Sequence, residues 1–102
     1  MYTAHMTYHF REEKMDEALE IWKGAILEPI SKAPGFHQVV MLRGQGGLAV
    51  AMGMWDSRES ADAFMATGAA KKLFDLISPY FSEKPQHLNM TLEILQKAES
   101  GK

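Results

Sequence analysis

Cysteine is absent from this sequence of 102 residues. The chain therefore has no disulfide framework, no thiolate nucleophile and no cysteine-based zinc site. An excess of charge of one sign is missing as well, because 11 basic and 13 acidic residues give a net charge of −2. A chain with this balance lacks the basic patch through which proteins bind nucleic acid or an anionic membrane surface. We therefore expect neither nucleic acid nor a membrane as a partner.

Long apolar runs are also missing. No run approaches the ~18 residues that a membrane-spanning helix needs. The first residues, Met1 to His5, contain neither the basic segment nor the apolar segment of a secretory signal. We therefore expect a cytoplasmic protein. Its length suits one domain, which we place at residues 1–96, followed by a polar tail at residues 97–102.

Hydrophobic periodicity predicts four strands. Apolar and polar residues alternate over residues 2–10 and 86–95, and residues 36–43 show a mixed pattern between turn signals. Residues 48–55 contain no polar side chain at all. Because a strand turns successive side chains to opposite faces, this third strand is expected to be buried on both faces.

Apolar residues at three- and four-residue spacing predict two helices. The first begins at the charged patch 11–14 and ends at Ala33-Pro34-Gly35, where a proline and a glycine stop it. The second is capped by Asp56 or Ser57 and interrupted at Gly68. The resulting order predicts an α+β, ferredoxin-like βαββαβ fold, with a four-stranded antiparallel sheet and both helices on one face.

The other face of this sheet needs a cover. If the helices cover the apolar sides of the first and last strands, polar residues of both strands share the opposite side. The third strand would still expose one apolar set at the centre of the sheet, and exposed patches of that kind mark interfaces. The two polar rows are Thr3, His5, Thr7 and His9 on the first strand, and His87, Asn89, Thr91 and Glu93 on the last.

We therefore predict that a second copy packs its sheet across this face with two-fold symmetry, which makes a homodimeric α/β barrel. Facing sheets lie about 10 Å apart, and Ala49, Ala51 and Gly53 are too small to fill such a gap. A partly polar pocket within each half of the dimer follows. The alternative is that these small residues only allow the two sheets to pack closely.

The histidines on the polar row are the candidate catalytic residues. His5 or His9, tuned by Glu93, could remove a phenolic or quinol proton near neutral pH. The resulting anion would react with dioxygen directly. The alternative is that both histidines only line a wet surface. They cannot share one metal ion, because four residues along a strand span ~13 Å, so no metal site is assigned, although either could meet His87 or Asn89 across the strand pair.

Several features resemble the dimeric α/β barrel superfamily, and within it the antibiotic biosynthesis monooxygenases. They are the strand order, the Pro34-Gly35-Phe36 start of the second strand, and the Val-x-x-x-x-Trp-x-Ser pattern of Val50, Trp55 and Ser57. The resemblance covers about residues 2–95. It implies a cofactor-independent monooxygenase that acts on an aromatic or quinol-like small molecule. The alternatives are a non-catalytic, small-molecule-binding or stress-associated barrel protein, and an isomerase or lyase.

Within this family, the haem-degrading members match this chain least well. They carry an Asn on the first strand and a Trp and a His after the strand-end Trp, where this chain has Thr7, Phe64 and Phe74. Phenylalanine offers no axial ligand to iron, so neither haem nor another cofactor is expected. The residues expected to contact an apolar or aromatic substrate are Thr7, Ala51, Gly53, Trp55, Phe64, Phe74, Asn89 and Glu93.

Overall fold

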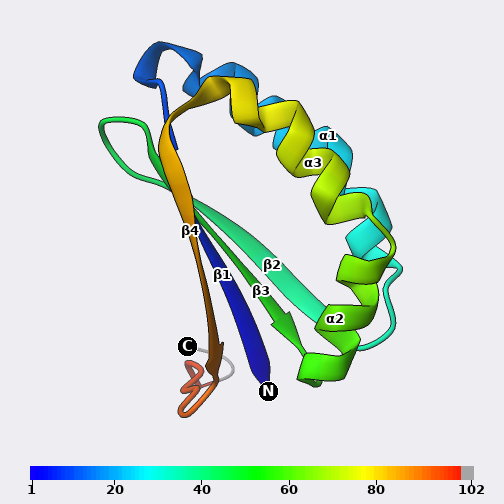
Figure 1. Ribbon diagram of the computed structural model, residues 1–102. Coiled ribbons are helices and arrows are strands. Elements are labelled where there is room, and N and C mark those ends of the chain that lie inside the picture. The colour runs from blue at the N-terminus through cyan, green and yellow to red at the C-terminus, as the bar shows by residue number, and fades with distance from the viewer. Residues whose placement is uncertain (100–102) are drawn as a thin grey trace.

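The alternating residues at the start of the chain form the central strand of the sheet. In the computed structural model, which describes residues 1–99, β1 (Tyr2–Phe10) pairs antiparallel with β3 (Leu48–Trp55) and with β4 (Phe81–Thr91). The edge strand β2 (Phe36–Arg43) pairs with β3, so the strand order is β2-β3-β1-β4. This is the predicted ferredoxin-like sheet, with the first and third strands in the middle (Figure 1).

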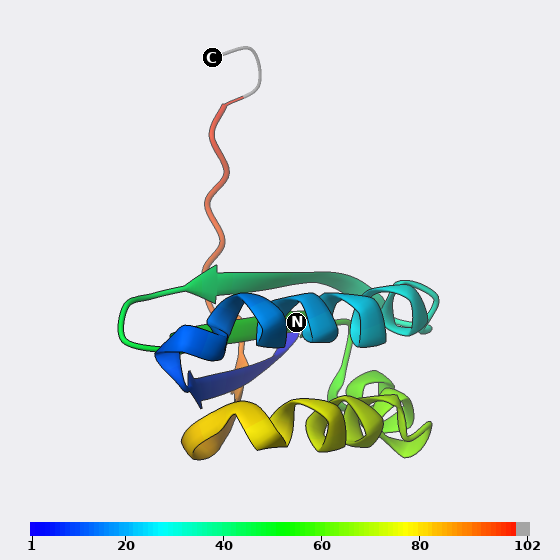
Figure 2. The same ribbon diagram turned by 90° about the horizontal axis from the view of Figure 1, so that it is seen from above.

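Helices cover one face of the sheet (Figures 1 and 2). The 3₁₀ turn η1 (Glu12–Lys14) leads into α1 (Met15–Ser31), whose apolar stripe is buried and which accommodates Pro29 inside its last turns. Two shorter helices follow β3, α2 (Arg58–Ala66) and α3 (Ala69–Ile77). Gly68, at φ 85°, lies between them in a left-handed conformation that favours glycine. The 3₁₀ turn η2 (Ser78–Tyr80) then leads into β4.

The pairing register separates two faces of the sheet. Residues directly opposite each other in an antiparallel pair point to the same side. The helix face carries Tyr2, Ala4, Met6, Tyr8 and Phe10 of β1, opposite Trp55, Gly53, Ala51 and Ala49 of β3. The open face, which no helix covers, carries Thr3, His5, Thr7 and His9 of β1, opposite Met54, Met52, Val50 and Leu48 of β3.

The last strand differs from its prediction in position and in orientation. It spans Phe81–Thr91 rather than residues 86–95, because Phe81 and the polar residues after it join the sheet instead of forming a loop. Its register places Leu88 opposite His5 and Met90 opposite Thr3, both on the open face. The expectation that the helices cover the apolar side of the last strand is therefore wrong.

Packing at the start of β4 explains this orientation. The Phe81 ring lies against those of Phe10, Tyr8 and Phe74, at centroid distances of 5.6, 6.1 and 5.5 Å, so Phe81 faces the helices. Two register shifts follow within β4. Each inserted residue reverses the alternation of side chains, and two reversals cancel. His87 and Asn89 therefore share the side of Phe81, and Leu88 and Met90 point outward.

Residues 92–99 follow β4 without regular secondary structure. The polar tail predicted at residues 97–102 falls in this part, and its last three residues lie outside those that the structure describes. Within residues 1–99, no helix is both long enough and apolar enough to cross a lipid bilayer.

Candidate functional site

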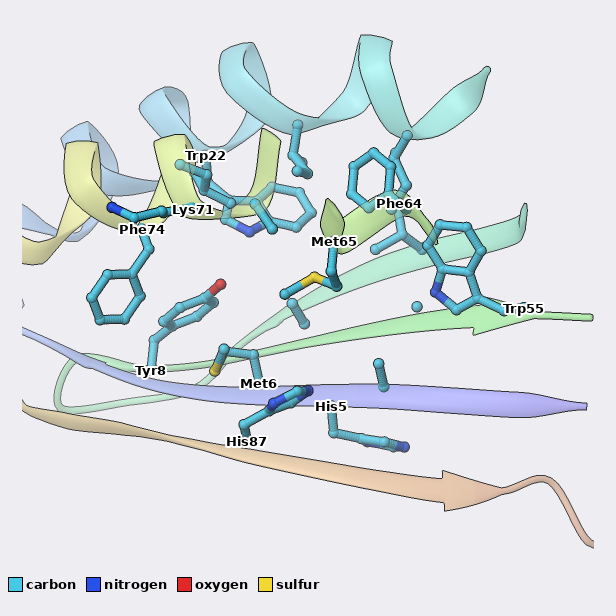
Figure 3. Close-up of a pocket in the computed structure, with 18 of the residues that line it drawn as sticks. His5, Met6, Tyr8, Trp22, Trp55, Phe64, Met65, Lys71, Phe74 and His87 are labelled. Atoms are coloured by element: carbon cyan, nitrogen blue, oxygen red, sulfur yellow. The ribbon is translucent and has the colours of Figure 1, made fainter. Parts of the chain in front are cut away.

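A cavity of about 520 Å³ lies between the helix face of the sheet and the helices (Figure 3). That volume falls in the range of small-molecule sites, which are mostly apolar with a few placed polar groups. The strands contribute Ala4, His5, Met6, Tyr8, Val39, Ala51, Gly53, Trp55 and His87, and the helices contribute Trp22, Ile26, Ile30, Phe64, Met65, Ala70, Lys71, Leu73, Phe74 and Asp75.

The small residues of β3 form the floor of this cavity. Ala51 and Gly53 point toward the helices, so the space above them is enclosed by the chain's own helices. Any room that Ala51 and Gly53 leave for a ligand therefore lies on the helix face of the sheet. These small residues therefore leave no gap between two facing sheets, because they do not lie on the open face. A pocket between the sheets of a dimer stays a prediction.

Aromatic side chains wall the end of the cavity beyond Gly53. The Trp55 ring lies 5.5 Å from Phe64 and 5.3 Å from Phe36, measured between centroids. Trp55 is 3% exposed and Phe64 is 6% exposed, so this wall is held rigidly. At the mouth, Phe74 is 40% exposed and contacts Phe81. The cavity therefore offers flat aromatic surfaces that suit a planar ligand.

Tyr8 and Trp22 place polar atoms in the apolar interior. The Tyr8 side chain extends from β1 toward the helix layer and lies below Trp22 of α1 (Figure 3). Both residues are buried. Burial raises the pKa of Tyr8, and a hydrogen bond with Trp22 offsets part of that rise. The hydroxyl therefore keeps its proton at neutral pH.

Charged and titratable side chains gather at the mouth of the cavity. His87 extends from β4 on the side of the helices, opposite Met6 of β1. Across the mouth, the Lys71 Nζ atom lies 3.2 Å from the Asp75 Oδ2 atom on the exposed side of α3. The cavity therefore has a polar rim and an apolar interior, which would contact different ends of a bound ligand.

The side chains of the two predicted catalytic histidines point to the open face, although His5 is among the residues that border the cavity and His9 is not. Figure 3 shows the His5 ring turned away from the helices, on the opposite side of β1 from His87. The Thr3 Oγ1 atom donates to the Met90 carbonyl oxygen at 2.9 Å, so it accepts from His5 Nε2 at 3.1 Å. This contact leaves the Nδ1 atom of a neutral His5 ring as an acceptor on the open face.

The other predicted site residues fall into two groups. Ala51, Gly53, Trp55, Phe64 and Phe74 all line the cavity, and their role as substrate contacts stays a prediction. Thr7 shares the open face with His5 and His9, opposite Val50. Asn89 lies on the helix face of β4 but outside the cavity lining, and Glu93 follows the end of the strand.

Glu93 is therefore not brought beside His5 or His9 by the pairing of β1 with β4, because His5 lies opposite Leu88 and His9 lies opposite Glu83. Within residues 1–99, no group of three or more metal-ligating side chains comes together. The tuning of a histidine base by Glu93 therefore gets no support from the strand pairing and stays a prediction.

Several cavity residues were not singled out by sequence reasoning. Tyr8, Trp22 and Lys71 all line the cavity. His87 was placed on the same side of the sheet as His5. The face of His87 depends on the packing of Phe81 and on the two register shifts that follow it. The first shift turns Glu83 to the open face and the second returns His87 to the helix face, so no periodicity in the sequence could have shown this.

The chain is similar to known proteins in its sequence and in its fold. Residues 1–76 match the family model described as antibiotic biosynthesis monooxygenase. No curated protein matches the chain. Among solved structures, a monooxygenase of Streptomyces coelicolor, from the gene ActVA-Orf6 and in complex with the ligand nanaomycin D, superposes with a TM-score of 0.82. It is 19% identical, and the match covers 96% of this chain and 92% of that one.

Two further structures are similar. A crystal structure of an antibiotic biosynthesis monooxygenase has a TM-score of 0.78 and 19% identity, covering 92% of this chain and all of that one. A conserved protein from Methanosarcina mazei Go1 has a TM-score of 0.79 and 16% identity, covering 90% and 92% of the two chains. At these identities the likeness establishes the fold, and function has to be argued from the cavity.

Proposed function

Because the chain belongs to the antibiotic biosynthesis monooxygenase family, with residues 1–76 matching the family model, we propose that it oxidises an aromatic or quinol-like small molecule without a cofactor. The observation that carries this proposal is the cavity of about 520 Å³ between the sheet and the helices. Its flat walls, Trp55, Phe64 and Phe74, suit stacking against a planar ring system. The ligand found with the Streptomyces coelicolor neighbour supports small-molecule binding by this fold.

The chemistry needs only a base and dioxygen. Transfer of an activated C–H or O–H proton from the substrate to the base leaves an electron-rich anion. A carbon of this anion forms a bond to dioxygen with its electron pair, the terminal oxygen takes up a proton, and the hydroperoxide loses water to leave a carbonyl. One oxygen atom enters the product and the other leaves as water, so the reaction is a monooxygenation.

His87 is the base that this geometry favours. Its ring lies at the mouth of the cavity on the helix side, where an entering substrate passes (Figure 3). An imidazole exchanges protons near neutral pH. His5 and His9, which were expected to act as the base, face the other side of the sheet. They can take that role only if a substrate binds on the open face.

A non-catalytic binding protein is the second candidate function. It is supported by the chemistry of the cavity interior. Among the described residues, the titratable group there is the Tyr8 hydroxyl, and this hydroxyl keeps its proton. A ligand that reaches past the mouth would meet aromatic and aliphatic walls but no base. Binding without turnover would then be the whole function.

Oxygen uptake with a panel of anthrones and quinols separates the two functions. The variant Met65→Trp enlarges a half-exposed side chain at the mouth and is expected to reduce uptake at least tenfold. Leu76→Trp, an exposed residue of α3 outside the cavity lining, is the matched control and should keep the wild-type rate. Binding of these compounds with no uptake of oxygen would favour the non-catalytic candidate.

We further propose that the functional unit is a homodimer that packs open face against open face. Leu88 and Leu42 are 59% exposed there, and Met90 is 46% exposed. β3 adds Val50 and Met52 to the same face. An apolar surface of this kind, centred on a sheet without helices, supports burial by a second copy.

A further inference from the structure

Two polar groups, the Tyr8 hydroxyl and the Trp22 indole N–H, lie inside the cavity, where packing alone does not require them. We propose that the Tyr8 hydroxyl, which lies below Trp22 in the cavity, is the hydrogen-bond donor that recognises a carbonyl oxygen of the ligand. The cavity would therefore bind the carbonyl form of an aromatic molecule more tightly than the same ring system without that oxygen. This inference rests on the proposed function, because it concerns the same cavity and defines its ligand further.

The direction of the hydrogen bond within the pair follows from chemistry. An indole nitrogen can only donate, so in any contact between the two groups the Trp22 N–H is the donor and the Tyr8 oxygen is the acceptor. The Tyr8 O–H proton is not consumed by this contact. Because burial raises the pKa of Tyr8, that proton stays on the oxygen and can be donated to a ligand.

The Tyr8 ring is held in place by its neighbours. Its centroid lies 5.3 Å from that of Phe10 and 6.1 Å from that of Phe81, and both pairs are stacked. The pairing of β1 with β4 is shifted at Tyr8, between the pairs Thr7–Gln86 and His9–Glu83. Pro85 lies in this shifted stretch and has no N–H for a ladder bond. Bulges of this kind re-aim side chains beside binding sites.

The position of the donor in the cavity indicates the chemistry of the ligand. Phenylalanine would provide the same stacking with Phe10 and Phe81, so the hydroxyl is the part of Tyr8 that packing does not need. Trp55 adds a second N–H that is turned toward the cavity above Gly53 (Figure 3). The interior thus presents donors, whereas the ionisable groups Asp75 and His87 lie at the mouth. A ligand with an acceptor oxygen at its inner end satisfies this arrangement.

A ligand hydroxyl fits the same place less well. It carries its own proton, which needs an acceptor, and at the Tyr8 oxygen it would compete with the nearby Trp22 N–H, which can only donate. A carbonyl oxygen brings no proton and accepts directly from Tyr8. The pair therefore favours a quinone or ketone oxygen at the inner end.

The test compares 1,4-naphthoquinone with naphthalene, which has the same rings and no oxygen. The sequence contains two tryptophans, Trp22 and Trp55, so the two indole N–H signals of a ¹H–¹⁵N NMR spectrum report on the cavity during each titration. The wild type should bind the quinone more tightly than naphthalene. Tyr8→Phe should weaken quinone binding about fivefold, the value of one neutral hydrogen bond, and leave naphthalene binding unchanged.

Tyr2→Phe is the matched control, because Tyr2 lies on the same strand and the same face but outside the cavity lining. It should keep the wild-type preference. Trp22→Phe, which removes the donor to Tyr8, should narrow the preference without abolishing binding, and it serves as a second variant if Tyr8→Phe does not fold. An equal loss of both ligands in Tyr8→Phe, or an unchanged preference, would overturn the inference and leave the proposed function standing. Binding of neither ligand to the wild type would overturn both.

Discussion

The indole ring of Trp55 lies over Gly53, with its Nε1 atom 3.3 Å from the point where a Cβ atom on residue 53 would lie. Trp55 is packed between Phe36 and Phe64, so it can move only by disturbing both rings. A side chain at residue 53 would therefore crowd the indole N–H and fill part of the cavity floor. Glycine at this position keeps a flat aromatic wall beside an open space.

The variant Gly53→Ala tests this relationship. Its methyl group is expected to weaken binding of 1,4-naphthoquinone severalfold, because it narrows the floor and shifts the Trp55 ring. The cost of overpacking, about 1 kcal/mol or more, is offset by the lower chain entropy of alanine, so the free energy of unfolding should change by less than ~1 kcal/mol. Urea unfolding and ligand titration measure the two effects separately.

Gly24→Ala is the control for that variant. Gly24 lies within α1 on its exposed side, and nothing lies within 4 Å of the Cβ position. Alanine should raise the free energy of unfolding by about 1 kcal/mol, the difference in helix propensity, without affecting binding. Equal binding by the Gly53→Ala variant and the wild type would show that the floor of the cavity does not contact the ligand.

Replacing the histidines one at a time identifies the base. His87→Ala should lower the rate of oxygen uptake about 100-fold or more, because general base catalysis contributes at least that factor. His5→Ala and His9→Ala are matched substitutions on the opposite face and should retain the rate. Loss of turnover in either of these two, with retention in His87→Ala, would place the reaction on the open face, as the sequence predicts.

The sequence specified most of the fold and part of the site. The bounds of β1 follow from the alternation of its residues, and those of β2 and β3 follow from the turn residues that flank them. The face of β4 does not, because it depends on the packing of Phe81 and on two register shifts that cancel, and neither is visible as periodicity. That single orientation decides whether His87 shares the side of His5 or of Tyr8.

Some of the cavity residues could likewise be predicted from the sequence, and others could not. Ala51, Gly53 and Trp55 line the cavity because one face of β3 is small and ends in an aromatic ring, a pattern that can be read in the sequence. Thr7 and His9 lie on the open face, as their alternation predicts, but the small residues of β3 that were expected to form a pocket with them face the helices. The interior donor pair joins Tyr8 of β1 to Trp22 of α1, and such a contact between two elements needs the packed structure.

The homodimer is tested by a charge on the open face. Wild-type protein should sediment as a dimer at micromolar concentration. Leu88→Lys places a charge on the apolar face beside His5 and should raise the dissociation constant at least 100-fold, since an unpaired buried charge costs about 3 kcal/mol. Leu76→Lys, at an exposed leucine of α3, is the matched control and should remain dimeric. A wild-type monomer would contradict the proposal.

The raised pKa of Tyr8 predicts how stability depends on alkaline pH. Below the ordinary tyrosine pKa of 10.0, the hydroxyl is protonated in both the folded and the unfolded chain, and Tyr8 adds no pH dependence. Above that value the unfolded chain loses the Tyr8 proton first, because burial keeps it on the folded protein. The unfolded state then binds fewer protons, so the free energy of unfolding falls as the pH rises.

Urea unfolding between pH 9 and pH 11.5 measures this slope. In Tyr8→Phe the fall above pH 10 should be shallower than in the wild type, although the variant starts from a lower stability because the Trp22 N–H loses its acceptor. Tyr80→Phe is the comparison. The pKa of Tyr80 is also raised, first by a hydrogen bond with Glu17, but its hydroxyl lies at the surface where solvent screens the interaction, so a smaller change in slope is expected. Identical slopes in Tyr8→Phe and the wild type would mean that the Tyr8 hydroxyl is open to solvent rather than held in the apolar interior of the cavity.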